Sequence, residues 1–357
     1  MIKYLGSKRT LLPFIGAIAS SSGAETAVDL FTGTTRVAQE FKRRGLKVLA
    51  SDISTYSEIL AQTYIVADGA TENIDEIKAK LTYLQNLPGK SGYFTKTFCV
   101  DSRYFQPKNG EKVDAIRDEL ELNFRDDPHF PILLTSLMLG ADRVDSTTGV
   151  QMAYLKQWAA RAHNDLELRM PELISGSGSA VRGDALEVVP TFETADLFYM
   201  DPPYNQHRYF TNYHIWETLV RWDEPESYGI AMKRIDSRDE GTKSVFNKKR
   251  EMPVAFKKVI EQAKGKMVVV SYNNESWVDA SDISQALYDA GHEAVSLMEF
   301  DYKRYVGAQI GIFNPNGEKV GKVGALRNKE LVFVAGDASA VEDASKAVAS
   351  LRPPTLF

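Results

Sequence analysis

Short apolar runs alternate with longer amphipathic stretches along most of the sequence. The runs are apolar at consecutive positions, which is typical of strands buried on both faces of a parallel sheet. The stretches between them place apolar residues three and four positions apart, which predicts helices. Strands are expected near residues 28, 48, 182, 198, 268, 298 and 332. This alternation predicts an α/β fold with a seven-stranded sheet, whose last two strands form a long hairpin with its turn at residues 314–317.

Residues 54–180 hold more helical pattern than such a sheet requires. A crossover between parallel strands needs one helix. We therefore expect a mainly helical insertion at 54–180, between sheet segments at 1–53 and 181–336. A polar loop at 142–149 either contacts nucleic acid or caps helices, and both alternatives stay open. The five amphipathic stretches of this interval are at 58–66, 74–87, 113–122, 132–139 and 152–166.

A strand at 27–31, a turn containing Gly33 and a helix at 36–44 form the start of a nucleotide-binding unit. The second strand ends in Asp52, 19 residues after Gly33, where a carboxylate can accept both hydroxyls of a ribose. A dinucleotide fingerprint needs three glycines, whereas Thr35 and Ala38 stand at the other two places. The loop therefore counts against a pyrophosphate cradle. The plain alternative is that Gly33 is only a turn glycine.

The strand at 196–200 ends in Asp201-Pro202-Pro203-Tyr204, where a parallel sheet presents its ligand-binding edge. Two prolines remove two backbone donors, which leaves a carboxylate, bare carbonyl oxygens and one aromatic ring. This set suits an exocyclic aromatic amine, whose two N–H groups could be accepted by Asp201 and the Pro202 carbonyl while Tyr204 stacks on the base. A strand terminator without chemistry is the alternative.

Asp-Pro-Pro-Tyr is also the catalytic tetrad of amino-group DNA methyltransferases, and the chain resembles their Dam-type (alpha class) members. The resemblance covers most of residues 1–336 in the order Lys8 element, Gly33 loop, Asp52, helical insertion, Asp184 and tetrad. It implies a Rossmann-like methyltransferase sheet of seven strands that ends in a hairpin. It also implies S-adenosylmethionine as cofactor and Asp201, Pro202, Pro203 and Tyr204 as catalytic residues.

The same resemblance implies which residues hold the cofactor. The family's aromatic-x-Gly-x-Lys element corresponds to Tyr4 and Lys8, and Asp184 would bond the cofactor's adenine amine. The alternative for Lys8 is a solvated lysine at a helix start, and the alternative for Asp184 is a helix N-cap. The full implied set is Tyr4, Lys8, Asp29, Phe31, Gly33, Thr34, Thr35, Asp52, Ile53, Asp184, Ala185 and Asp201.

The implied activity is methylation of the adenine N6 amine in a specific double-stranded DNA sequence, with the base flipped out of the duplex. Rival readings are a cytosine N4 methyltransferase, an RNA or protein amide methyltransferase, a non-catalytic binding protein that keeps the cofactor fold, and a nicotinamide-dependent oxidoreductase. The single-glycine loop speaks against the oxidoreductase, and the intact tetrad against the binding protein. A separate cognate restriction endonuclease is left open as a partner.

Charge is distributed unevenly. The net charge is −5, yet residues 233–258 carry nine basic against four acidic side chains, and residues 303–329 carry six against one. Solvated basic loops are the bland explanation, and a face that contacts phosphates is the other. We expect residues 205–255 to form a mobile basic segment that contacts DNA, and Trp216 within it to lie in the core. The DNA-contacting candidates are Tyr209, Phe210, Lys243, Lys248, Lys249, Arg250, Lys303 and Arg304.

Composition removes several other classes of protein. The one cysteine, Cys99, excludes an internal disulfide framework, and the five histidines show no paired ligand spacing, so no metal is expected. The nearest pair, His214 and Glu217, is better explained by a helix surface. No run approaches the length of a membrane span, which suggests a cytoplasmic protein. Residues 337–357 form an Ala/Ser-rich tail that predicts little.

Overall fold

The computed structural model describes residues 2–192, 194–204, 206, 208–274, 276–303 and 327–351. The chain divides into two compact units. The first unit comprises Met1–Ser7, Thr32–Asp184 and His207–Ser244. The second unit comprises Lys8–Phe31, Ala185–Gln206 and Val245–Phe357. Within the described residues, no helix is both long and apolar enough to cross a bilayer.

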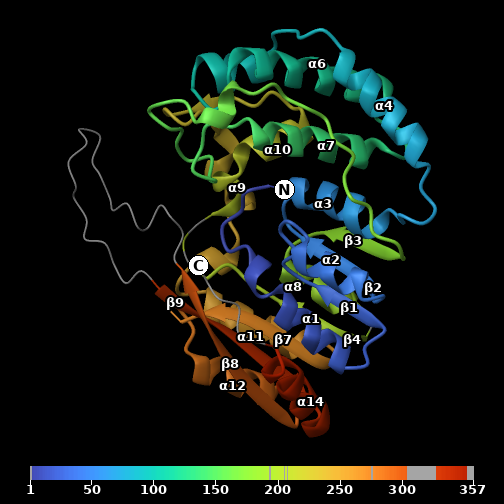
Figure 1. Ribbon diagram of the computed structural model, residues 1–357. Helices are drawn as coiled ribbons and strands as arrows, with labels where there is room; N and C mark the ends of the chain where they lie inside the picture. The colour runs from blue at the N-terminus through green and yellow to red at the C-terminus, as the bar shows by residue number, and fades with distance from the viewer. Residues whose placement is uncertain are drawn as a thin grey trace. The chain divides into compact units, whose positions relative to one another are not determined.

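The main sheet has seven strands, as predicted (Figure 1). They are β1 (Thr26–Asp29), β2 (Lys47–Asp52), β3 (Gly178–Arg182), β4 (Ala195–Met200), β7 (Gly265–Asn273), β8 (Ala294–Lys303) and β9 (Arg327–Gly336). Their order is β3-β2-β1-β4-β7-β9-β8. The strands β1, β4 and β7 are parallel, as are β2 and β3, and β9 runs antiparallel to both β7 and β8. The α/β class and the antiparallel last pair are confirmed, and the expected turn at 314–317 lies outside the described residues.

The first unit is mainly helical. Its α-helices are α2 (Arg36–Arg43), α3 (Thr55–Ala61), α4 (Ile74–Asn86), α5 (Tyr93–Thr95), α6 (Pro107–Asn123), α7 (Phe130–Arg143), α9 (Tyr209–Asn212) and α10 (His214–Arg221), and a short ribbon joins β5 (Ser227–Tyr228) to β6 (Lys233–Arg234). In Figure 1, α4, α6, α7 and α10 lie together. One apolar cluster fills the space between them, and Trp216 belongs to it with 1% exposure, as predicted.

Four of the five helical stretches expected in the insertion are present, and the fifth is wrong. Residues 152–166 contain only a 3₁₀ turn at Ala160–His163. Their backbone pairs elsewhere: the N–H of Leu155 donates to the Ser146 carbonyl at 2.9 Å, and the N–H of Leu166 donates to Asn109 Oδ1 at 2.9 Å. Bonds to groups outside the segment override a helical pattern here, because each N–H donates to one partner.

The polar loop after α7 has a structural role at its two aspartates. Asp142 and Asp145 are both buried, and each forms an ion pair with Lys3 at 3.1 Å. Asp145 also pairs with Arg161 at 2.7 Å. These ion pairs do not decide between the nucleic-acid contact and the helix cap that the sequence left open for this loop.

The second unit contains strands β1, β4, β7, β8 and β9 of the sheet, together with the helices beside them. Its α-helices are α1 (Leu12–Ser21), α8 (Ala185–Val188), α11 (Met252–Gln262), α12 (Ala280–Asp289) and α14 (Ala338–Ala349). The helix α14 packs against α1, and α11 packs against α12. The pattern of the C-terminal tail did not predict α14, because alanine and serine supply only a narrow apolar face, on which Val341 and Ala344 are buried.

Candidate active site

Asp201 lies at the carboxyl end of β4, at the point where the prolines stop the strand. Met200 pairs with Val270 of β7, so both strands run toward the same edge of the sheet. The strand β9 runs in the opposite direction and begins at this edge. Its Glu330 pairs with Asn273, the last residue of β7. Strand direction therefore brings the start of β9 to the edge at which β4 ends.

Four side chains of the second unit form one polar cluster. Lys8 Nζ lies 3.1 Å from Asp201 Oδ1 and also contacts Glu330 Oε1 and the Tyr204 hydroxyl. The Tyr204 hydroxyl contacts Asp201 Oδ1 and lies 3.0 Å from Glu330 Oε1. We call these residues, Lys8, Asp201, Tyr204 and Glu330, the tetrad cluster. It contains one ammonium group, two carboxylates and one hydroxyl proton.

Burial perturbs the pKa values of three groups of the tetrad cluster, Asp201, Lys8 and Tyr204. Burial raises the pKa of Asp201 to about 6, because desolvation and the Glu330 charge together outweigh the stabilising effect of Lys8 and Tyr204. For Lys8, burial lowers the pKa, but the neighbouring Asp201 and Glu330 carboxylates raise it more, so it stays above its ordinary value. The pKa of Tyr204 is well above 10, because of burial and both carboxylates. At neutral pH Lys8 is charged and Asp201 is mostly ionised.

The Tyr204 ring is held as firmly as its hydroxyl. It meets the Tyr272 ring edge-on, with centroids 5.2 Å apart and an interplanar angle of 83°. Lys8 Nζ lies 4.7 Å from the centre of the same ring, a cation–π contact. Pro202 is buried and Pro203 is half-buried beside it. The sequence-predicted catalytic residues are therefore together at the strand end, in contact with the predicted lysine.

Three further candidates belong to the second unit. Asp29, the last residue of β1, has 1% exposure. Phe31 follows it and meets Phe246 edge-on, with ring centroids 5.0 Å apart. Ala185 is buried at the first position of α8.

The Gly33 loop of the first unit is shaped by a tyrosine ring. Gly33 has φ +49°, and a Cβ at this position would lie 3.0 Å from the Tyr4 ring. Both features require glycine, because an L side chain strains at positive φ and the ring leaves it no room. The Gly33 N–H donates to Asp52 Oδ2 at 2.9 Å, and the Ser54 N–H donates to Oδ1 at 2.9 Å. Asp52 thus ties the loop to the end of β2.

Thr35 takes a glycine-like conformation in the same loop. Its φ is +61°, in the left-handed region, and its side chain is fully buried. Its Oγ1 accepts a hydrogen bond from Gln39 Nε2 at 2.8 Å, which holds the residue at the start of α2. Thr34 is buried beside it at 8% exposure. Thr35, at a place where the dinucleotide fingerprint has a glycine, thus takes a left-handed conformation that glycine adopts easily.

Tyr4 packs against two other tyrosines, Tyr209 and Tyr213, whose rings also lie 6.3 Å apart and nearly parallel to each other. Its ring centroid is 4.8 Å from that of Tyr213 and 5.3 Å from that of Tyr209, with interplanar angles of 16° and 26°. The Leu5 N–H donates to the Tyr213 hydroxyl at 2.6 Å, which fixes the chain next to the ring. Tyr209, a predicted base-stacking residue, therefore has one of its faces on Tyr4. The sequence offered no signal for this stack, since its members are more than 200 positions apart.

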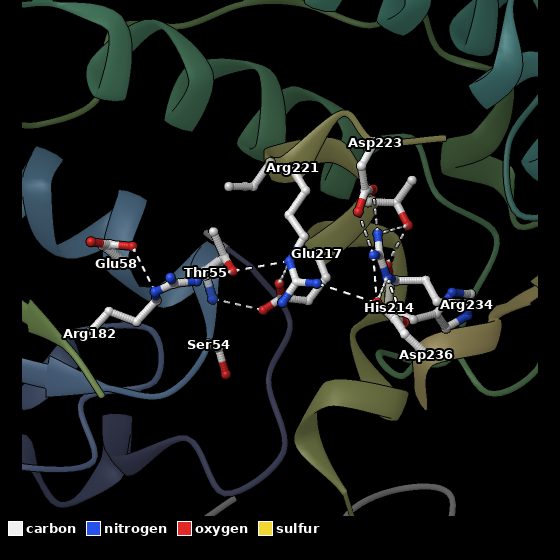
Figure 2. A network of polar contacts seen from close by, with 12 residues as sticks. Ser54, Thr55, Glu58, Arg182, His214, Glu217, Arg221, Asp223, Arg234 and Asp236 are labelled. Atoms are coloured by element: carbon white, nitrogen blue, oxygen red, sulfur yellow. Dashed lines mark hydrogen bonds and ion pairs between the residues drawn. The ribbon is translucent and has the colours of Figure 1, made fainter. Parts of the chain in front are cut away.

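A polar network in the first unit connects α3, α10 and the β5–β6 ribbon (Figure 2). Glu217 is fully buried and its Oε1 accepts the Thr55 N–H at 2.8 Å, while Arg221 Nε lies 3.1 Å from its other oxygen. Arg234, with 2% exposure, donates to both oxygens of Asp223 at 2.7 and 2.6 Å. This arginine was counted in the basic segment, but a buried forked ion pair makes it structural.

The same network corrects the interpretation of His214 and Glu217 as a helix surface. Both side chains have 0% exposure. His214 Nε2 contacts the Gln151 carbonyl oxygen at 2.9 Å, and burial lowers the His214 pKa to about 3. The helix therefore buries its polar residues His214 and Glu217 as well as its apolar face, which the apolar spacing alone did not predict.

The other candidates have contacts of their own. Lys243 pairs with Glu240, and Lys248 lies 3.5 Å from Glu251. The Arg221 guanidinium lies over the Phe210 ring, 5.3 Å from the ring centre. The remaining positions are as follows: Ile53 is 47% exposed, Asp184 is half-buried, Lys249 and Arg250 are exposed, Lys303 ends β8, and Arg304 lies outside the described residues.

Glu330 is the member of the tetrad cluster that sequence reasoning missed. It occupies the fourth position of a strand otherwise rich in apolar residues, where its side chain is 6% exposed. A buried carboxylate in an apolar strand costs free energy unless it is paired. The available signal was strand direction, because the amino end of an antiparallel strand meets the carboxyl ends of its parallel neighbours.

Comparison with known proteins shows the family of the chain. The family model described as D12 class N6 adenine-specific DNA methyltransferase matches residues 4–282. The chain is 30% identical to the modification methylase StsI of Streptococcus sanguinis, over 87% of this chain and 50% of that protein. It is 29% identical to the Type II methyltransferase M.NlaIII of Neisseria lactamica, over 85% and 92% respectively. Against the Type II methyltransferase M.FokI of Planomicrobium okeanokoites the identity is 29%, over 85% and 50%. The chain thus spans about half the length of two of these relatives and nearly all of the third.

Proposed function

Because this chain belongs to the D12 class of N6 adenine-specific DNA methyltransferases, we propose that it methylates the exocyclic N6 amine of adenine in a specific double-stranded DNA sequence. The observation that carries the proposal is the position of Asp201, ionised at neutral pH and held at the end of β4 by Lys8 and Tyr204. S-adenosylmethionine, when bound, supplies an electrophilic methyl group on a sulfonium. The residues of this chain have to make a poor nucleophile attack it.

The adenine amine is a poor nucleophile because its lone pair is delocalised into the ring. Acceptors on its two N–H groups favour a tetrahedral nitrogen with a localised lone pair. Among the described residues, Lys8 and Tyr204 both contact Asp201 through Oδ1, which leaves Oδ2 to accept one N–H. The Pro202 carbonyl would accept the other. The nitrogen held in this way would accept the methyl group that S-adenosylmethionine supplies and would then release one N–H proton to water, so no general base of high pKa is needed.

The residues of the Gly33 loop fit a nucleoside with no phosphate. Each oxygen of Asp52 accepts one backbone N–H and keeps a further lone pair for a ribose hydroxyl. The loop has a single flexible glycine, and its other turn position is filled by Thr35. We propose that Asp52 binds the ribose of S-adenosylmethionine, with Tyr4, Gly33, Thr34, Ile53 and Asp184 around the nucleoside. Lys8 is already engaged by two carboxylates, so we assign it to ordering Asp201.

Double-stranded DNA is the proposed partner. Flipping a base out of the duplex has a cost that stacking on aromatic side chains offsets. Tyr204, Tyr209 and Phe210 are the aromatic candidates, and the exposed Lys249 and Arg250 are candidates for phosphate contacts. The helical residues 54–180 are the proposed recognition part. A cognate restriction endonuclease and a cytoplasmic location belong to the same proposal, because the named relatives are modification methylases.

The test is to express the chain in a bacterial host without adenine methylation and to sequence its DNA with detection of modified bases. We expect N6-methyladenine at one short recurring sequence. An Asp201→Ala chain, expressed at the same level, should leave the DNA unmodified. Modification of cytosine instead of adenine, or no modification by the wild-type chain, would overturn the proposal.

A further inference from the structure

The tetrad cluster holds one more carboxylate than its single ammonium group can neutralise. We propose that Glu330 is a positioning residue for methyl transfer: it shares Lys8 and the Tyr204 hydroxyl with Asp201, so that Asp201 keeps acceptor capacity for the substrate amine. This inference rests on the proposed function, because it assigns a partner to the same reacting carboxylate.

The two donors of the tetrad cluster, Lys8 and the Tyr204 hydroxyl, each have two carboxylate acceptors within reach. The Tyr204 hydroxyl has one proton, yet it lies within bonding distance of Asp201 Oδ1 and of Glu330 Oε1. It can donate to only one of them at a time. Lys8 Nζ likewise contacts both carboxylates. A donor that is bound to Asp201 competes with the amine N–H for electron density on that carboxylate. Glu330 gives both donors a second acceptor.

The sheet fixes the position of Glu330. Its backbone pairs with Asn273, and the next residue along β9 pairs with Tyr272. On the other side, the Lys329 N–H donates to Asn274 Oδ1 at 3.0 Å, and the Asn274 N–H donates to the Lys329 carbonyl at 3.1 Å. A carboxylate on such a strand stays in place, so it fixes the position of Lys8 and of the Tyr204 hydroxyl, both of which contact it. This rigidity is what a positioning residue requires.

Charge gives the proposal a distinctive pH signature. Glu330 raises the pKa of Asp201, whereas Lys8 lowers it, after burial as the largest cause. Removing the negative charge of Glu330 should therefore lower the Asp201 pKa and extend activity to lower pH. A residue that only supported the fold would not move that pH limit. The titratable or charged groups that face Asp201, directly or through Tyr199, are Lys8, Glu330, Tyr204, Tyr199 and Asp29.

The experiment compares Glu330→Gln, Glu330→Asp and the control Glu299→Gln with the wild type. Glu299 lies on the neighbouring strand β8, is 49% exposed, and pairs with Lys329 at 2.5 Å. The readout is the single-turnover rate of methyl transfer from labelled S-adenosylmethionine to DNA between pH 5 and 8, a window of about one to two units on either side of the Asp201 pKa. Thermal melting of each variant shows whether it is folded.

We expect Glu330→Gln to be slowed by about tenfold at its pH optimum, with its acid limb at lower pH than in the wild type. Glu330→Asp, which keeps the charge but shortens the side chain, should recover part of the rate and the wild-type acid limb. Glu299→Gln should match the wild type in both. If Glu330→Gln is unfolded, Glu330→Asp decides the matter alone, and a wild-type rate in it would overturn the inference.

Failure of the inference differs visibly from failure of the proposed function. If the wild type methylates adenine and Glu330→Gln matches it in rate and acid limb, Glu330 has no positioning role. A slower Glu330→Gln with an unmoved acid limb would also overturn the inference, because it indicates a structural residue. If the wild type itself methylates no adenine, both claims fail together.

Discussion

Glu217 in the first unit is fully buried and Asp201 in the second is half-buried, and burial raises the pKa of both carboxylates, yet they have opposite kinds of partner. Glu217 accepts the backbone N–H of Thr55 and pairs with Arg221 one helical turn along its own helix (Figure 2). Among the described residues, Asp201 is held by side chains through one oxygen. Burial and a raised pKa therefore do not identify a functional carboxylate. A functional carboxylate is identified by its ability to exchange hydrogen-bond partners.

Two other carboxylates of the first unit extend this comparison. Asp114 accepts the backbone N–H groups of Gly92, Phe94 and Thr95 at 2.8 to 3.0 Å, which makes it structural, like Glu217. Asp52 is intermediate, because it accepts two backbone N–H groups and is also the proposed ribose ligand.

The largest effect is expected for Asp201→Asn. An amide in place of the carboxylate donates toward Lys8 and the amine, so we expect the single-turnover rate to fall by about 10³-fold. The free energy of unfolding should change by no more than about 1 kcal/mol, since no backbone group loses its partner. Rates with labelled cofactor and urea melts give the two values. A large loss of stability would show that Asp201, like Glu217, is a structural carboxylate.

Glu217→Gln should show the reverse behaviour. It weakens the bond to the Thr55 N–H and leaves Arg221 without its buried counterion, so we expect the free energy of unfolding to fall by about 2 kcal/mol. The rate of methyl transfer, measured well below the melting temperature, should stay close to that of the wild type. A stable but inactive Glu217→Gln protein would break the comparison.

Asp52→Asn tests the intermediate case. An asparagine can accept only through its one oxygen, so either the Gly33 or the Ser54 N–H loses its acceptor. We expect the Kd for S-adenosylmethionine to rise about tenfold, which corresponds to about 1.4 kcal/mol. Calorimetric titration measures it. At saturating cofactor the methyl-transfer rate should be unchanged, and a lower saturated rate would show that Asp52 acts in the chemical step.

The smallest effect is a shift in pH dependence. Asp201 must be ionised, so the wild-type rate should fall as pH drops through about 6. Lys8 stabilises the ionised form, so Lys8→Met should raise the Asp201 pKa and move the acid limb to higher pH. Rates of both proteins across the pH range give the answer. An acid limb that moves to lower pH in Lys8→Met would contradict the geometry of the tetrad cluster.

Local pattern predicted the sheet and part of the site, because the features involved are local. The run before Asp201 is apolar and stops at two prolines, and Gly33 and Asp52 flank one strand–helix–strand unit. Long-range pairing was beyond this reasoning. The helix expected at 152–166 is replaced by backbone bonds to distant residues, and Glu330 enters the cluster only because β9 runs antiparallel to its neighbours.

The central claim is that Asp201 activates the adenine amine, and labelled product analysis tests it most directly. Purified wild-type and Asp201→Asn proteins are incubated with tritiated S-adenosylmethionine and double-stranded DNA, and the DNA is digested to nucleosides and separated. We predict that the label appears in N6-methyldeoxyadenosine with the wild type and is absent with Asp201→Asn. Label in a cytosine nucleoside, or equal label from both proteins, would contradict the account.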